Sequence, residues 1–161
     1  MSTKIVAIRH GKSEDLGDYE SDSLRPLTKE GQDIQQRMSE HLKAEGLTPN
    51  LILNSPLLRA QQTAQILALN FDVDYLDEHA LGNEFDSHTL MQRINMIGQG
   101  HTIFLVGHEP TLADFVNHLV GKAALPLGLS KSAAAVIEFE GKVDIGEGTF
   151  LKVYEPTDLG L

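Results

Sequence analysis

The sequence of 161 residues contains no cysteine. This absence excludes disulfide bonds, thiolate metal sites and cysteine nucleophiles. The chain also lacks a continuous apolar run of about 18 residues, which is the length that a membrane-spanning helix needs. Met1 to Lys4 do not have the long apolar core of a signal peptide. We therefore expect a cytoplasmic protein that does not associate with a membrane.

The chain has fewer basic residues than acidic residues. The chain has 13 Lys and Arg against 23 Asp and Glu, which gives a formal net charge of −10. This acidic balance argues against binding nucleic acid or acidic lipid over a broad surface, although it permits one small basic pocket. No repeat, linker or low-complexity segment divides the chain. The length predicts a single domain over residues 1–161, and without an obvious extra apolar helix we expect a monomer.

Several common motifs of enzymes are missing as well. The sequence contains neither G-x-x-x-x-G-K-[ST] nor G-x-G-x-x-G, so it has no standard nucleotide-binding loop, and it contains no G-x-S-x-G elbow. His108-Glu109 begins like a zinc-protease motif, but Leu112 stands where the second histidine would be. Asp72-Val73-Asp74 resembles an aspartyl-phosphate motif, but it follows no strong buried strand.

Short apolar runs alternate with helical patterns over the first two-thirds of the chain. This alternation is typical of a three-layer α/β/α sandwich with a mainly parallel sheet. We expect buried strands at 4–9, 51–53 and 101–106, an edge strand at 72–76, late strands at 133–139 and 149–154, and helices over 28–44, from Ser55-Pro56 to about 68, over 87–97 and over 110–120.

Cationic and titratable residues follow the three buried strands. These are Arg9-His10, Arg59 and His108. Ligands bind at the carboxyl ends of the strands in such sheets, and two of the three positions are also helix N-termini, which favour anions. A single histidine or arginine in such a place is more often structural, but the four together predict a cationic pocket. Phosphate is its natural ligand because arginine pairs with phosphate oxygens bidentately.

The same residues lie in three blocks that resemble the histidine phosphatase superfamily, with its phosphoglycerate mutase-like fold. The blocks are R-H-G at 9–11, S-P-L-L-R-A-Q-Q-T-A at 55–64 and V-G-H-E-P at 106–110, in the order of the family. The segment D-S-L-R-P-L-T-K-E-G at 22–31 resembles the SixA-type phosphohistidine phosphatases. The short chain, which has no room for a long cap, also resembles that branch.

This resemblance implies that His10 is the nucleophile and becomes a phosphohistidine. It implies that Arg9, Arg59 and His108 hold the phosphoryl oxygens, with no metal or other cofactor. Two arginines provide the positioning and the charge neutralisation that phosphoryl transfer needs. Nearby positive charge is expected to lower the pKa of His10 and so favour its neutral, nucleophilic form. His108 offers a positive donor if it is protonated and one N–H if it is neutral.

Two further residues have an open role at this stage. Ser13 either donates its hydroxyl to the phosphate or only shapes the loop. Arg25 either lines the approach to the pocket or is a surface residue of the turn before Pro26.

The chain departs from the family in one place. Mutase-like members have a glutamate in an L-x-E motif that acts as general acid, but the spacing from Leu81 to Glu84 is one residue too long. Glu84 and Asp86 are possible acids, although we expect neither to act. A phosphohistidine P–N bond is labile and its imidazole leaves easily, whereas an alcohol needs a proton to leave. The departure therefore favours phosphohistidine as the substrate.

The expected function is that of a metal-independent phosphohistidine phosphatase. The resemblance implies a partner protein as substrate, either a histidine-containing phosphotransfer domain or a phosphocarrier protein of a bacterial system. Two alternatives stay open. One is a phosphatase of the same superfamily that acts on small phosphomonoesters, and the other is a non-catalytic module that binds phosphoproteins.

Overall fold

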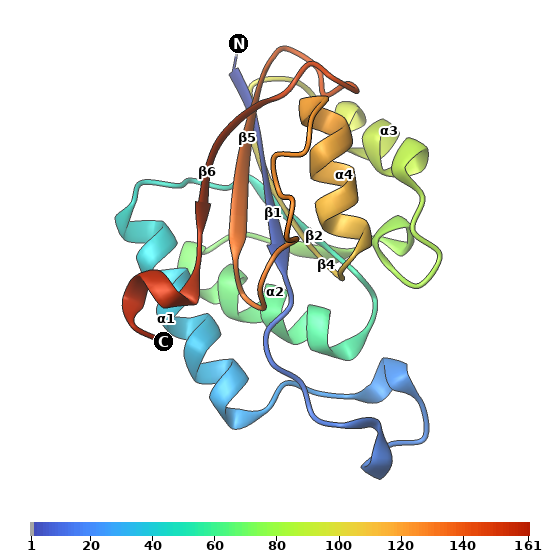
Figure 1. Ribbon diagram of the computed structural model, residues 1–161, viewed down its shortest axis with the longest axis vertical. Helices are drawn as coiled ribbons and strands as arrows, with labels where there is room; N and C mark the ends of the chain where they lie inside the picture. The colour runs from blue at the N-terminus through green and yellow to red at the C-terminus, as the bar shows by residue number, and fades with distance from the viewer. Residues whose placement is uncertain (1) are drawn as a thin grey trace.

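A six-stranded sheet forms the centre of the computed structural model, which describes residues 2–161 (Figure 1). Its strand order is β3-β2-β4-β1-β5-β6. The strands β3, β2, β4 and β1 are parallel to one another. β5 pairs antiparallel with β1, and β6 pairs antiparallel with β5. In chain order the strands are β1 (Ser2–Arg9), β2 (Leu51–Asn54), β3 (Tyr75–Asp77), β4 (Thr102–Gly107), β5 (Ala134–Glu140) and β6 (Thr149–Tyr154).

Helices cover both faces of the sheet. On one face, α1 (Lys29–Ala44) and α2 (Leu58–Phe71) pack Met38, Leu42 and Leu67 against Val6 and Ile8 of β1. On the other face, α3 (Ser87–Ile97) and α4 (Thr111–Val120) contribute to a second core cluster. The predicted three-layer α/β/α fold with a mostly parallel sheet is confirmed (Figure 1).

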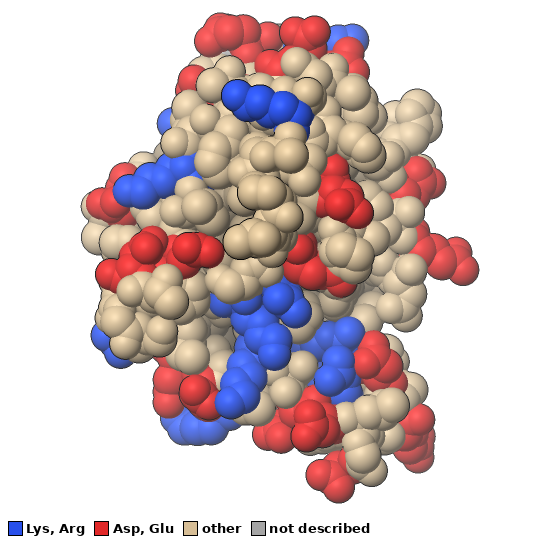
Figure 2. Space-filling view, viewed as in Figure 1, with Lys and Arg blue, Asp and Glu red and all other residues tan. Residues whose placement is uncertain are grey.

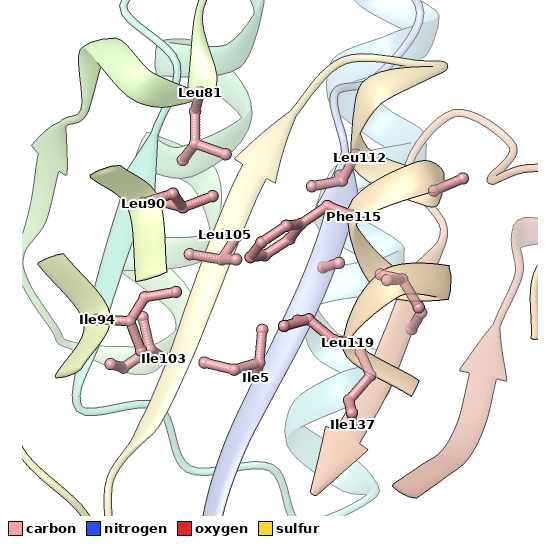
Figure 3. Packing of buried hydrophobic residues seen from close by; sticks show 14 of the residues in the cluster. Ile5, Leu81, Leu90, Ile94, Ile103, Leu105, Leu112, Phe115, Leu119 and Ile137 are labelled. Atoms are coloured by element: carbon pink, nitrogen blue, oxygen red, sulfur yellow. The ribbon is translucent and has the colours of Figure 1, made fainter. Parts of the chain in front are cut away.

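The second core cluster shows why the middle of β1, from Ile5 to Ile8, is apolar. Ile5 points from β1 toward Phe115 and Leu119 of α4, and Ile94 of α3 packs on Ile103 of β4 (Figure 3). Successive residues of a strand point to opposite faces, and both faces of this sheet are covered. A continuous apolar run therefore forms the strand. None of the helices described in residues 2–161 is long and apolar enough to cross a membrane.

Most elements agree closely with the sequence-based expectations, including the first helix, where Thr28 Oγ1 accepts from Gly31 N at 2.8 Å. Two expectations were wrong. α2 begins at Leu58 instead of Pro56, because Ser55 Oγ bonds to Leu57 N and to His108. The edge strand does not begin at Asp72, which ends α2 in a left-handed conformation (φ 54°).

Candidate active site

Strand register brings the two candidate histidines together. Arg9 pairs with Gly107 at the parallel ends of β1 and β4, so the residues that follow, His10 and His108, are neighbours. The centroids of their rings lie 5.1 Å apart. They border a cavity of about 450 Å³, which is lined by Arg9, His10, Ser13, Asp15, Arg25, Arg59, Gly82, Asn83, His108, Glu109, Thr111 and Lys131.

The cavity gathers the site residues predicted from sequence except the two possible acids, Glu84 and Asp86. Arg9, His10, Arg59 and His108 line it, and so do Ser13 and Arg25. Glu84 is exposed and does not line it. Figure 2 shows Lys and Arg side chains gathered in the lower half of this face, near the level at which β1 ends in Figure 1, with acidic side chains around them. A cationic pocket is thus built into an acidic protein.

Backbone contacts fix the orientation of the His10 ring. Its Nδ1 lies 2.7 Å from the carbonyl oxygen of Gly11. A carbonyl only accepts, so Nδ1 carries the proton and Nε2 keeps its lone pair. Gly11 N in turn donates to Thr63 Oγ1 at 3.1 Å, and the Thr63 hydroxyl donates to the carbonyl oxygen of Arg59 at 2.8 Å. The loop that carries His10 is therefore tied to α2.

His10 is buried and neutral at physiological pH. Burial lowers the pKa of His10 to about 3, the hydrogen bond to Gly11 opposes this shift, and the charges of His108, Arg59 and Arg9 add to it. Nearby positive charge contributes to the lowered pKa of His10 as expected, but burial of the ring has the larger effect. The physical reason is that imidazolium loses its hydration in this site.

Ser55 supports the second histidine. The Ser55 hydroxyl lies 2.7 Å from His108 Nε2 and also accepts from Leu57 N at 3.2 Å. Burial lowers the pKa of His108 to about 4, and nearby arginines contribute to the shift while Asp22 opposes it. His108 is thus neutral at pH 7 and offers one N–H, which is the second of the two possibilities considered for it.

The arginines keep hydrogen-bond donors available for a ligand. Arg9 Nη1 donates to the carbonyl oxygen of Leu129 at 3.1 Å, and Arg59 Nη1 and Nη2 donate to Asp22. Among residues 2–161, the Nε atoms of Arg9 and Arg59 are buried with no hydrogen-bond partner. Unpaired guanidinium N–H groups are suited to phosphate oxygens.

Comparison with known proteins identifies the family. Residues 5–86 match the histidine phosphatase superfamily (branch 1). The chain belongs to the histidine phosphatase superfamily. It is 32% identical over 145 residues to an uncharacterised protein of Picosynechococcus sp., covering 83% of this chain and 88% of that protein. It is 28% identical over 161 residues to the phosphohistidine phosphatase SixA of Escherichia coli, covering 97% and 96% of the two chains.

A solved structure agrees with this relationship. The structure of the protein histidine phosphatase SixA complexed with tungstate superimposes with a TM-score of 0.84 at 26% identity, covering 97% of this chain and 99% of the other. Within the superfamily the chain is therefore of the SixA type, as its sequence motifs predicted.

In the segment that follows Leu81, an asparagine and not a glutamate lines the cavity. Counting from Leu81, the L-x-E pattern places its glutamate at position 83, where this chain has Asn83. Asn83 lines the cavity, whereas Glu84 does not. The spacing of the motif was the signal that could have pointed to Asn83.

Five other lining residues were not predicted from the sequence: Asp15, Gly82, Glu109, Thr111 and Lys131. The Glu109 carboxylate accepts from Ala113 N at 2.9 Å and from Leu129 N at 3.0 Å, so both of its oxygens are engaged. Within residues 2–161, no group of three or more His, Asp or Glu side chains is placed to hold a metal ion. The cationic side chains that line the cavity are Arg9, Arg25, Arg59 and Lys131.

Proposed function

We propose that this protein is a metal-independent phosphohistidine phosphatase that removes the phosphoryl group from a histidine of a partner protein. The observation that carries the proposal is the pairing of a neutral, oriented His10 with arginines in a cavity that Asn83 lines and Glu84 does not. The proposal agrees with the activity named for SixA, which this chain resembles over nearly its whole length.

In the proposed reaction, His10 Nε2 attacks phosphorus and a new N–P bond forms. The N–P bond of the substrate breaks, and its imidazole leaves with the electron pair and takes a proton from water. A second water molecule then attacks the phosphohistidine at His10, which releases inorganic phosphate and restores the imidazole. The proton that this water gives up neutralises the hydroxide left by the first, so one water molecule is consumed in all. Arg9 and Arg59 neutralise the charge on the equatorial oxygens in both steps.

Asn83 explains why a phosphohistidine is the favoured substrate. An amide holds a phosphoryl oxygen or a leaving group by hydrogen bonding but does not supply a proton. An alkoxide leaving group needs that proton, while imidazole is a better leaving group without it. The cavity therefore matches N–P chemistry better than O–P chemistry.

The proposed partner is a protein, either a histidine-containing phosphotransfer domain or a phosphocarrier protein in the cytoplasm. The exposed Lys131 and the half-buried Arg25 line the cavity and would meet the phosphorylated surface of such a partner. The protein's own acidic surplus disfavours nucleic acid as a competing ligand.

The test compares two kinds of substrate without added metal. We expect kcat/KM for a phosphohistidine-bearing phosphotransfer domain to exceed kcat/KM for p-nitrophenyl phosphate by at least about a hundredfold, because the imidazole leaving group needs no general acid. Rapid hydrolysis of the ester with the phosphoprotein left untouched would contradict the proposal.

The alternative of a small-molecule phosphatase needs a carboxylic acid in the cavity. Asp15 is an exposed carboxylate that lines it, and Glu84 lies just outside. We expect Glu84→Gln to change kcat for either substrate by less than about twofold. A loss of more than about tenfold in Glu84→Gln or Asp15→Asn on phosphomonoesters would favour the alternative, since general acid catalysis contributes at least that much.

A further inference from the structure

Asp22 holds two arginines of the cavity without lining the cavity itself. Its carboxylate Oδ2 accepts from Arg59 Nη2 at 3.0 Å, and its backbone oxygen accepts from Arg59 Nη1 at 2.9 Å. Its other carboxylate oxygen, Oδ1, accepts from Arg25 Nε at 2.9 Å. A single residue thus joins an arginine of α2 to an arginine of the segment between β1 and α1.

The donors that Asp22 uses leave others for a ligand. A guanidinium group has five N–H groups, and Asp22 takes two of those on Arg59 and one of those on Arg25. The buried Nε of Arg59 has no partner among the described residues. Arg25 Nη1 donates to the carbonyl oxygen of Glu14 at 3.1 Å, and Arg25 lines the cavity.

Asp22 lies in a short helical turn, Asp22–Leu24, of a segment that is largely exposed. Its side chain is 49% exposed, whereas that of Arg59 is only 8% exposed. The residue therefore contacts the arginines from the solvent side. Burial alone would raise the pKa of Asp22, but the hydrogen bonds and charges of Arg59 and Arg25 lower it, so the carboxylate is ionised at neutral pH.

Two roles are compatible with a carboxylate on these arginines. It competes with phosphate for them, or it fixes them for phosphate. A competitor would occupy the space of the phosphate, but Asp22 is absent from the residues that line the cavity. Second partners of ligand-binding groups generally orient those groups, and losing one costs about 10- to 100-fold in affinity at well-studied metal sites.

We propose that Asp22 is a positioning residue, which aligns Arg59 and Arg25 on the phosphoryl oxygens and so makes Arg25 part of the phosphate site. This inference rests on the proposed function in taking a phosphoryl group as the ligand. Arg25 lines the cavity, which favours the first of the two roles considered for it, and its Nε is held by Asp22.

The test measures binding of tungstate and of inorganic phosphate by calorimetry, in the wild type and in Asp22→Asn. The amide of asparagine keeps one acceptor but sets an NH2 group against one of the two guanidinium groups. We expect oxyanion affinity to fall by about tenfold. The matched control is Asp18→Asn, which removes one negative charge from an exposed position of the same segment; we expect its affinity to stay within about twofold of the wild type.

The sign of the effect separates the two roles, because removing a competing anion raises affinity. Tighter binding by Asp22→Asn, affinity equal to that of Asp18→Asn, or no oxyanion binding by the wild type would each overturn the inference. Binding requires no turnover, so the inference is tested even if the wild type proves inactive on phosphohistidine. In another outcome, the wild type hydrolyses phosphohistidine while Asp22→Asn binds oxyanions as tightly as the wild type does. That result would contradict the role of Asp22 and leave the proposed function unaffected.

A double variant distinguishes positioning from general destabilisation. If Asp22 acts through Arg25, the affinity lost in Asp22→Asn/Arg25→Ala is smaller than the product of the two single losses. Losses that simply multiply would show that Asp22 does not act through Arg25 and would overturn that part of the inference. For the enzyme reaction we expect Asp22→Asn to raise KM and lower kcat, since the arginines contact the phosphoryl group in the ground state and in the transition state.

Discussion

The buried, neutral His10 makes the free energy of unfolding depend on pH. Its pKa is about 3 in the folded protein, against an ordinary value of 6.5. Between these values the unfolded chain binds a proton that the folded chain does not, so stability rises with pH and is lost as the pH falls below about 6.5. Integrating this difference from pH 7.5 to pH 5.0 predicts that His10 alone accounts for a loss of about 2 kcal/mol.

Urea unfolding of the wild type and of His10→Asn at the two pH values measures this contribution. We expect the wild type to lose about 2 kcal/mol more than His10→Asn on going to pH 5.0, whatever the variant costs at pH 7.5. His88→Asn, at an exposed histidine, serves as the control and should follow the wild type. An equal loss in all three proteins would refute the reasoning, because it would mean that His10 titrates as it does in the unfolded chain.

Two further variants test the local structure around the site. In Gly31→Ala the added methyl group would overlap the backbone oxygen of Lys12, so we expect urea titration to show a free energy of unfolding lower by about 2 kcal/mol or more. Gly17→Ala is the control in the same titration, because its methyl group meets open space. In Ser55→Ala, His108 loses the partner of its Nε2, and we expect kcat/KM to fall by about tenfold. Unchanged kinetics of Ser55→Ala would show that this hydrogen bond does not support the reaction.

The parallel arrangement of the buried strands explains why much of the site could be predicted from the sequence. Buried strands can be recognised from their apolar runs, and the carboxyl ends of parallel strands meet at one edge. Arg9 ends such a strand, His10 and His108 directly follow one, and the structure places the three together. Their position therefore depends on strands and on little else.

The parts that could not be predicted depend on loops and on the use of individual hydroxyl and carboxylate groups. Ser55 was interpreted as a helix cap from its place before Pro56, but its hydroxyl faces a histidine from a strand 53 residues away in sequence. The contact of Asp22 with Arg59 spans 37 residues, and Lys131 reaches the cavity from the segment before β5. Neither periodicity nor local spacing encodes such pairs.

The most direct test of the account is phosphate release from a phosphohistidine-bearing phosphotransfer domain, without added metal, by the wild type and by His10→Ala. The account predicts release by the wild type and none above background by His10→Ala, which should still bind tungstate if the arginines stay in place. Equal release by both proteins would contradict the assignment of His10 as nucleophile. Binding of the phosphoprotein with no release by the wild type would instead indicate the non-catalytic binding module.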